Sequence, residues 1–180
     1  MFDAERAKRI KLVGTDVDGC LTDNGLYIGE IAGKRVELKR FDVVDGLGIT
    51  LLRNAGIEMA WISGRVSTAT QLRGTELMIG SVLQVASTGK VAAIEALLAE
   101  RRLTWNEMLY VGDDLPDIPV LRRVGLSIAV ANARPEVKAI CRYVTVAAGG
   151  HGALREVIDL LLRARGEWEH AARQYVGSES

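Results

Sequence analysis

Two aspartates separated by one residue, Asp16 and Asp18, follow a short apolar run near the start of the chain. Carboxylates this close raise the free energy of each other's ionisation unless a positive group lies between them. The pair is therefore either solvated in a turn or bound to a cation. Asp-x-Asp-Gly is also a common turn sequence, so the choice depends on the rest of the chain.

Three further polar groups follow later apolar runs. Ser63 lies in the segment ISGR, Lys90 stands where a helical pattern begins, and Asp113 belongs to the segment GDDLPD. Each has an ordinary structural explanation by itself, because serine is a frequent helix N-cap and lysine is usually solvated. Three carboxylates within five residues, however, are costly without a cation. The occurrence of all these groups at expected strand ends favours a joint chemical role.

That role is phosphoryl transfer with Mg²⁺. This ion takes oxygen ligands in octahedral geometry, and the Asp16 and Asp113 carboxylates with the Asp18 backbone carbonyl could supply them. A carboxylate nucleophile can form an acyl phosphate, which gives Asp16 that role and leaves Asp18 as general acid and base. Lys90 and the Ser63 hydroxyl would then hold the phosphoryl group.

The elements that must position these residues are predicted from an alternation of short apolar runs with segments of helical period. Predicted strands cover Lys11–Val17, Glu58–Ile62, Ser81–Gln84, Met108–Val111, Leu126–Val130 and Tyr143–Thr145. Predicted helices cover Gly46–Asn54, Ser67–Glu76, Gly89–Arg102, Asp117–Val124, Pro135–Ile140 and Ala153–Arg165. This order predicts an α/β fold, a doubly wound, mostly parallel sheet with helices on both faces. Such sheets bind ligands at the carboxyl ends of their strands.

Two segments stand outside this alternation. Residues 26–41 read as two strands around a Gly-containing turn, which predicts an inserted β-hairpin. We therefore expect a single domain over residues 1–165 and a C-terminal tail over residues 166–180. The tail is either a frayed end, which the sequence slightly favours, or an arm that docks elsewhere.

The charge balance, the cysteines and the apolar segments exclude several classes of protein. The 180 residues contain 23 basic and 23 acidic side chains, so nothing general favours a nucleic acid or an anionic membrane as partner. The two cysteines, Cys20 and Cys141, have no spacing of a metal site or redox pair, which predicts reduced thiols. The charged N-terminus does not resemble a signal peptide, and the apolar runs are too short to span a membrane. We expect a soluble, cytoplasmic protein.

The four groups of polar residues resemble motifs one to four of the haloacid dehalogenase superfamily of phosphatases. The resemblance extends over about residues 11–163. The segments DVDGCLTDNGLYIG, FDVVDGLGI, YVGDDLPDIPVL and AGGHGALREV closely resemble the capless subgroup that includes 3-deoxy-D-manno-octulosonate 8-phosphate phosphatases. Phosphatases acting on nine-carbon sialic-type sugar acid 9-phosphates belong to the same subgroup.

This resemblance implies roles for individual residues. Asp16 would be the nucleophile, Asp18 the general acid and base, Ser63 and Lys90 the phosphoryl-holding groups, and Asp16, Asp18 and Asp113 the Mg²⁺ ligands. Substrate contacts would come from Asp42, Val43, Val44, Asp45, Gly46, Arg65 and Arg73. The resemblance also implies that no separate cap domain is present. A homotetramer would form through the hairpin, and neighbouring subunits would cover each other's sites.

Three positions depart from the octulosonate-phosphate pattern. Val44, Thr50 and His151 stand where the family usually has basic residues, and arginine is well suited to a sugar-acid carboxylate. We therefore expect as substrate an eight-carbon or a nine-carbon sugar acid phosphate, or a simpler phosphate ester. Two remoter alternatives are a receiver domain, which the order of Lys90 before Asp113 opposes, and a non-catalytic binding domain.

Overall fold

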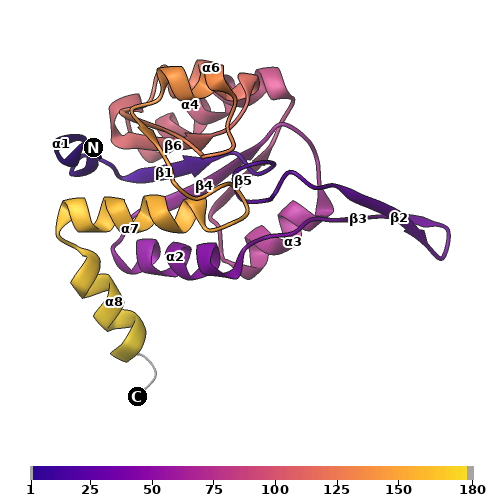
Figure 1. The fold of residues 1–180 in the computed structure, drawn as a ribbon, viewed down its shortest axis with the longest axis horizontal. Coiled ribbons are helices and arrows are strands. Elements are labelled where there is room, and N and C mark those ends of the chain that lie inside the picture. Colours follow the sequence, from indigo (N-terminus) through magenta and orange to yellow (C-terminus); the bar gives the residue numbers. More distant parts are fainter. Residues whose placement is uncertain (1, 178–180) are drawn as a thin grey trace.

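A six-stranded parallel sheet forms the centre of the protein (Figure 1). The structure is a computed structural model, and it describes residues 2–177. Neighbouring strands lie in the order β5-β4-β1-β6-β7-β8, each parallel to the next. The strands are β1 (Leu12–Thr15), β4 (Glu58–Ser63), β5 (Ser81–Gln84), β6 (Met108–Gly112), β7 (Leu126–Ala129) and β8 (Tyr143–Val144). The predicted doubly wound α/β fold is confirmed.

The strand order reverses at β1. From β1 the chain builds outward through β4 and β5 on one side, and then returns to build β6, β7 and β8 on the other. In doubly wound sheets the crevice at this reversal, beyond the carboxyl ends of the strands, is where ligands bind. The residues that follow β1 and β6 are therefore the first candidates for a functional site.

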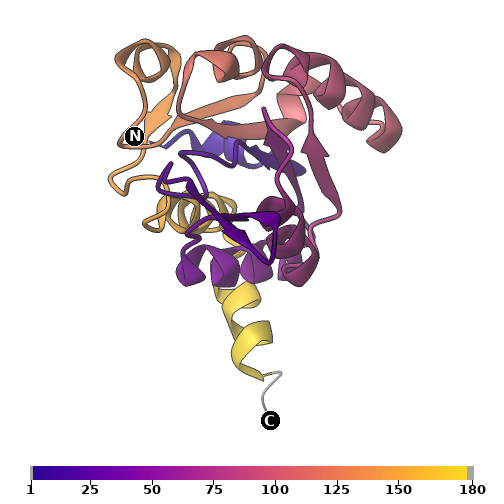
Figure 2. The ribbon, with the colours of Figure 1, turned by 90° about the vertical axis from the view of Figure 1, so that its right-hand side faces the viewer.

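Helices cover both faces of the sheet, as Figures 1 and 2 show. One face carries α2 (Val43–Asn54), α3 (Thr68–Glu76) and α7 (Ala153–Arg165), and the other carries α4 (Lys90–Arg101), α5 (Ile118–Leu121) and α6 (Pro135–Ile140). Because both faces are covered, the strands β1, β6 and β7 are buried along their whole length. The apolar stripe predicted for the last of these helices is also buried: Leu154, Val157, Ile158, Leu161 and Leu162.

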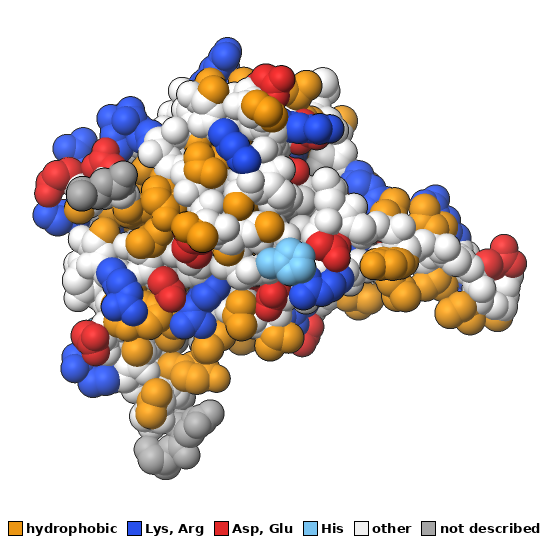
Figure 3. All heavy atoms as spheres, in the orientation of Figure 1, with side chains coloured by type: hydrophobic (Ala, Val, Ile, Leu, Met, Phe, Trp, Pro, Cys, Tyr) orange, Lys and Arg blue, Asp and Glu red, His pale blue; other side chains and the backbone are white. Residues whose placement is uncertain are grey.

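The predicted hairpin projects from the body of the protein (Figure 1). Its strands, β2 (Tyr27–Ile31) and β3 (Lys34–Leu38), pair antiparallel. Ala32 and Gly33 join them with positive φ values of 51° and 74°, which is the backbone of a tight two-residue hairpin turn. Apolar side chains gather along this arm in Figure 3, where Tyr27, Ile28, Ile31 and Leu38 are all more than half exposed.

The two ends of the chain add helices that the sequence pattern did not predict. A short helix, α1, covers Ala4–Ala7, and α8 covers Trp168–Gly177 in the tail. Trp168 packs under the guanidinium of Arg163 at 4.3 Å, and Ala171 is fully buried. The slightly favoured frayed end is therefore replaced by a helix up to residue 177, which packs through Trp168 and Ala171 while residues 173–177 are exposed. Residues 178–180 lie outside the described part of the chain.

The sequence also made predictions about the two cysteines and about membrane-spanning segments. Cys20 and Cys141 are free thiols, and Cys20 is buried. Within residues 2–177, no helix combines the length and the apolar character that crossing a bilayer requires.

Candidate active site

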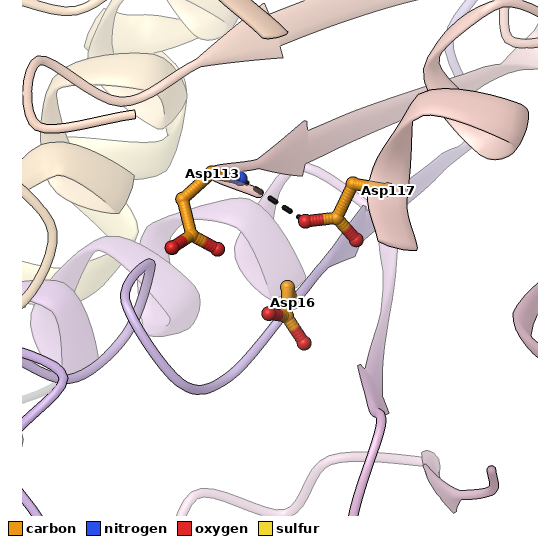
Figure 4. A group of neighbouring side chains, drawn as sticks. All are labelled: Asp16, Asp113 and Asp117. Carbon is orange, nitrogen blue, oxygen red and sulfur yellow. Dashed lines mark hydrogen bonds between the residues drawn. The ribbon is translucent and has the colours of Figure 1, made fainter. Parts of the chain in front are cut away.

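Three buried carboxylates meet at the carboxyl end of the sheet, at the strand reversal (Figure 4). Asp16 follows β1, Asp113 follows β6, and Asp117 lies one turn further along the chain. One oxygen of each lies within 4.8 Å of one oxygen of the others. The backbone N–H of Asp16 also donates to the carbonyl of Val111 at 2.9 Å, which ties the end of β1 to β6. Strand ends predicted from sequence thus bring Asp16 and Asp113 together.

Lys90, at the start of α4, lies between two of these carboxylates. Its Nζ is 2.8 Å from Asp16 Oδ1 and 2.8 Å from Asp117 Oδ1. Burial by itself would lower the pKa of this lysine, but Asp117 and Asp16 outweigh it and hold the pKa above the ordinary value. Lys90 is therefore a permanent ammonium group within the cluster, as its predicted role requires.

Asp117 has a supporting position that sequence reasoning did not assign. Its Oδ1 accepts hydrogen bonds from Lys90 and from the Tyr110 hydroxyl, both at 2.8 Å, and its Oδ2 accepts from the backbone N–H of Asp113 at 3.0 Å. With both oxygens engaged by protein donors, Asp117 holds Lys90 and the Asp113 backbone in place. Its presence in GDDLPD was the available signal, whereas nothing in the spacing pointed to Tyr110.

The carboxylate oxygens of Asp16 and Asp113 form a candidate cation site. Burial raises the pKa of Asp16 to about 6, helped by repulsion from Asp117. Burial also raises the pKa of Asp113 to about 8, with Asp16 and Asp117 adding to the effect. In the absence of a cation, this repulsion favours the binding of a proton within the cluster. Clustered carboxylate oxygens with uncompensated negative charge fit Mg²⁺, which prefers oxygen ligands. Binding of the ion would displace that proton.

Gly19 makes this cluster sterically possible. Its φ is +94°, and a Cβ at this position would lie 2.1 Å from Oδ2 of Asp113. A side chain would therefore displace the Asp113 carboxylate as well as strain the backbone.

We expect Gly19→Ala to reduce Mg²⁺-dependent activity by about 100-fold, the cost of a shift of about 1 Å in a positioned group. The matched control is Gly33→Ala in the hairpin turn, where φ is +74° and nothing lies within 4 Å of the added Cβ. Steady-state rates over a Mg²⁺ titration compare the two variants. Equal losses in both would mean that backbone strain, and not the contact with Asp113, is the cause.

A cavity of about 280 Å³ opens beside the carboxylates. Its polar walls include Asp16, Asp18, Arg65, Lys90 and Asp113. Ser63 ends β4 directly behind this lining, where its hydroxyl donates to the carbonyl of Arg65 at 2.9 Å. The structure thus brings five of the predicted residues to one cavity and places the serine next to it.

The predicted sugar-acid contacts other than Arg65 lie outside the cavity lining. Asp42 caps α2 by accepting from the backbone N–H of Val44 at 3.0 Å, and Val43 is exposed at the same helix end. Gly46 faces Arg73, whose guanidinium would lie 3.0 Å from an added Cβ. In the single chain these residues lie apart from the cavity lining, and Asp45 and Gly46 are buried, so their contact with substrate stays a prediction.

Asp45 is buried in this segment and supports another helix. Its Oδ1 accepts from the backbone N–H of Arg155 in the first turn of α7 at 2.8 Å, whereas its Oδ2 has no hydrogen-bond partner. Burial raises its pKa from 3.8 to about 6. The proton therefore binds the folded state more tightly than the unfolded state, and the stability contributed by this group is lost as the pH rises from about 4 to about 6.

We expect Asp45→Asn to raise the free energy of unfolding at pH 7 by about 1–2 kcal/mol, because the amide keeps the bond to Arg155 without a buried charge. At pH 4 the variant and the natural protein should be equally stable. Denaturant unfolding in chelator at both pH values measures this, with the helix-capping variant Asp42→Asn as control. A variant that is less stable at pH 7 would contradict the burial argument.

The fold and the site together define a class of enzyme, the haloacid dehalogenase-like hydrolases, and that family matches residues 81–157 of the chain. Over 171 residues the chain is 42% identical to the 3-deoxy-D-manno-octulosonate 8-phosphate phosphatase KdsC of Escherichia coli K12, covering 95% of this chain and 89% of the relative. The structure of the corresponding Yersinia pestis phosphatase superposes with a TM-score of 0.87 at 41% identity, covering 92% and 88% of the two chains.

A third relative carries ligands. The Moraxella catarrhalis 3-deoxy-D-manno-octulosonate 8-phosphate phosphatase, solved with a magnesium ion, a phosphate ion and a KDO molecule, superposes with a TM-score of 0.89 at 35% identity, covering 96% and 97% of the two chains. The chain therefore belongs to the 3-deoxy-D-manno-octulosonate 8-phosphate phosphatase group of the haloacid dehalogenase-like hydrolases.

Proposed function

We propose that this protein is a Mg²⁺-dependent phosphatase that hydrolyses 3-deoxy-D-manno-octulosonate 8-phosphate. The observation that carries the proposal is the meeting of Asp16, Asp113 and Lys90 at the strand reversal, beside a cavity that also contains Asp18. Family membership over nearly the whole chain supports the same activity. The setting would be lipopolysaccharide biosynthesis in the cytoplasm.

The reaction divides into two displacements at phosphorus. In the first, an Asp16 oxygen attacks the phosphoryl group, the bond from phosphorus to the sugar oxygen breaks, and the Asp18 carboxyl protonates the departing oxygen. In the second, the Asp18 carboxylate takes a proton from water, the water oxygen bonds to phosphorus, and the bond to Asp16 breaks. Phosphate leaves, and both aspartates return to their starting states.

Charge neutralisation is supplied by the groups around Asp16. Lys90 and Ser63 would hold the phosphoryl oxygens, and Asp16, the Asp18 carbonyl and Asp113 would hold Mg²⁺. When bound, the ion polarises the phosphoryl group and offsets the charge that develops on it. Asp117 fixes Lys90 and the Asp113 backbone while this happens.

A nine-carbon sugar acid 9-phosphate is the second candidate substrate. Val44 and His151 are exposed side chains without a permanent positive charge, and Thr50 donates its hydroxyl to the carbonyl of Gly46 at 3.3 Å. A sugar-acid carboxylate would lack the arginine contacts usual at these positions. The nine-carbon sugar acid has a carboxylate too, so these three positions separate the chain from the octulosonate pattern without selecting the longer substrate.

We also propose a homotetramer assembled through the hairpin. The exposed apolar side chains of Tyr27, Ile28, Ile31 and Leu38 form the kind of surface that marks an interface. In such an assembly, neighbouring subunits would cover each other's sites, and the exposed part of residues 42–46, which includes Val43 and Val44, would face the substrate of another subunit. Sedimentation velocity of the protein and of an Ile28→Lys variant tests the assembly.

The activity is tested by phosphate release from a panel containing the octulosonate 8-phosphate, nine-carbon sugar acid 9-phosphates and hexose phosphates. Preference for the octulosonate supports the first candidate, and preference for a nine-carbon ester supports the second. If the folded protein released no phosphate from any ester of the panel with Mg²⁺ present, both candidates would be contradicted and a binding role favoured.

Removal of divalent metal with a chelator is expected to abolish phosphate release, because three buried carboxylates then face the substrate phosphate without a cation. Excess Mg²⁺ should restore the rate, whereas Na⁺ at equal ionic strength should not. Turnover that persists after exhaustive chelation would contradict the metal requirement.

A further inference from the structure

A second buried ammonium group lies at the base of the hairpin. The side chain of Lys39 has no exposed surface, and its Nζ is 2.6 Å from Asp18 Oδ1. The same nitrogen donates to the Thr70 hydroxyl at 3.2 Å and lies 3.9 Å from Glu37 Oε1. Burying an ammonium group is costly unless it is paired, and here two oxygens lie within hydrogen-bond distance of the nitrogen while the Glu37 carboxylate adds a second negative charge nearby.

Glu37 links this lysine to Arg65, which lines the cavity. Arg65 donates two hydrogen bonds to it, at 3.0 and 2.7 Å, and the Ser67 hydroxyl donates a third at 2.6 Å. The hydrogen bond from Arg65 lowers the pKa of Glu37 to about 2, so it remains a carboxylate. Asp18, Lys39, Glu37 and Arg65 therefore form a network of two negative and two positive charges, here called the hairpin-base network.

The members of the hairpin-base network come from three separate segments. Glu37 lies in β3 and Lys39 follows it, whereas Asp18 follows β1 and Arg65 follows β4. Asp18 and Arg65 both line the cavity. The hairpin thus places two charges between two loops of the active site, in addition to the apolar surface that it exposes on its outer part.

We propose that Lys39 is a positioning residue for catalysis, one that holds the Asp18 carboxyl group through Oδ1 and so directs Oδ2 at the reacting oxygen. When Asp18 is protonated, the oxygen that accepts from Lys39 is the unprotonated one. The acidic proton is therefore carried on the oxygen that faces the departing sugar alkoxide. This inference rests on the proposed function, in which Asp18 is the general acid.

The simpler possibility is that Lys39 only anchors the hairpin. The two roles predict different effects of the leaving group on the rate that is lost when Lys39 is replaced. An alkyl phosphate such as the sugar-acid ester needs protonation of its departing alkoxide, whereas 4-nitrophenolate departs without it. The value of kcat/KM includes this departure and excludes the later hydrolysis of the aspartyl phosphate, so it isolates the step in which Asp18 acts as an acid.

The experiment compares Lys39→Met with the natural protein on the two esters. A positioned general acid contributes about 100-fold or more to rate, so we expect kcat/KM for the sugar-acid ester to fall at least about tenfold further than kcat/KM for 4-nitrophenyl phosphate. Lys39→Arg, which keeps a charged donor, should recover most of the difference. The control is Lys8→Met, which removes an exposed lysine outside the hairpin, paired with Glu5 at 2.8 Å, and should leave both values unchanged.

Equal losses on both esters in Lys39→Met would overturn the proposal and leave the anchoring role. If circular dichroism shows that Lys39→Met does not fold, Thr70→Val takes its place, because it removes one partner of the Lys39 nitrogen without uncovering a charge. That variant should show a smaller loss confined to the sugar-acid ester, and a loss shared by both esters would again overturn the proposal. Failure of the natural protein to hydrolyse either ester would instead refute the proposed function.

Discussion

Asp16→Asn is expected to reduce Mg²⁺-dependent phosphate release by at least about 10⁴-fold, the scale of loss seen when an enzyme's nucleophile is removed. The amide oxygen is a poor nucleophile, and the variant also loses one of the negative charges expected to hold the metal. Stability should not suffer, because burial and repulsion from Asp117 already oppose ionisation of Asp16. Lys90 would also keep Asp117 as its partner at 2.8 Å.

The measurement is a single-turnover assay, together with acid quenching to trap phosphorylated protein. Asp114→Asn is the matched control, because Asp114 belongs to the same group of strand ends but caps a short turn by accepting from the backbone N–H of Leu115 at 2.7 Å. The control should keep activity within a few-fold and form the phosphoprotein. Residual turnover above about 1% in Asp16→Asn would place the nucleophile elsewhere.

The fold could be predicted because its elements carry strong local signals. The strand at Ser81–Gln84 and the helices at Pro135–Ile140 and Ala153–Arg165 have the predicted bounds, since a buried apolar run or a 3.6-residue stripe is visible in sequence. The helix at Trp168–Gly177 lacks such a signal. It depends on contacts of Trp168 and Ala171 with the body of the protein, which only the tertiary structure reveals.

The site was predictable where residues stand at strand ends. Parallel topology forces Asp16 and Asp113 to the same edge, so their meeting follows from the strand assignment. The partners that support them were not predictable in this way. Tyr110 reaches Asp117 from inside a strand, and Lys39 reaches Asp18 from the base of a hairpin whose docking no periodicity encodes.

The predicted substrate segment illustrates a further limit. Residues 42–46 were assigned by resemblance, whereas the single chain uses Asp42 to cap α2 and Asp45 to hold the start of α7. A substrate contact that residues 42–46 make only across two chains would not follow from the packing of one chain. The segment's role in substrate binding therefore depends on the proposed assembly.

Lys90→Met is expected to abolish activity and to lower the free energy of unfolding by about 3–5 kcal/mol, because it leaves Asp16 and Asp117 buried without their counter-ion. The instructive control is Lys8→Met. Lys8 lies 2.8 Å from Glu5, the same separation as the two Lys90 pairs, but both members of this pair are exposed. Loss of the exposed pair should cause no measurable change, so any difference between the variants comes from burial rather than distance.

Saturating Mg²⁺ should recover part of the stability lost in Lys90→Met, since a cation bound to Asp16 and Asp113 supplies positive charge to the same cluster. The double variant Lys90→Met with Asp117→Asn should recover stability as well, by removing one of the unpaired carboxylates, yet remain inactive. Denaturant unfolding with and without Mg²⁺ measures both effects. If the double variant regained activity, the ammonium group of Lys90 would have only a structural role, and phosphoryl binding would have to come from elsewhere in the cavity.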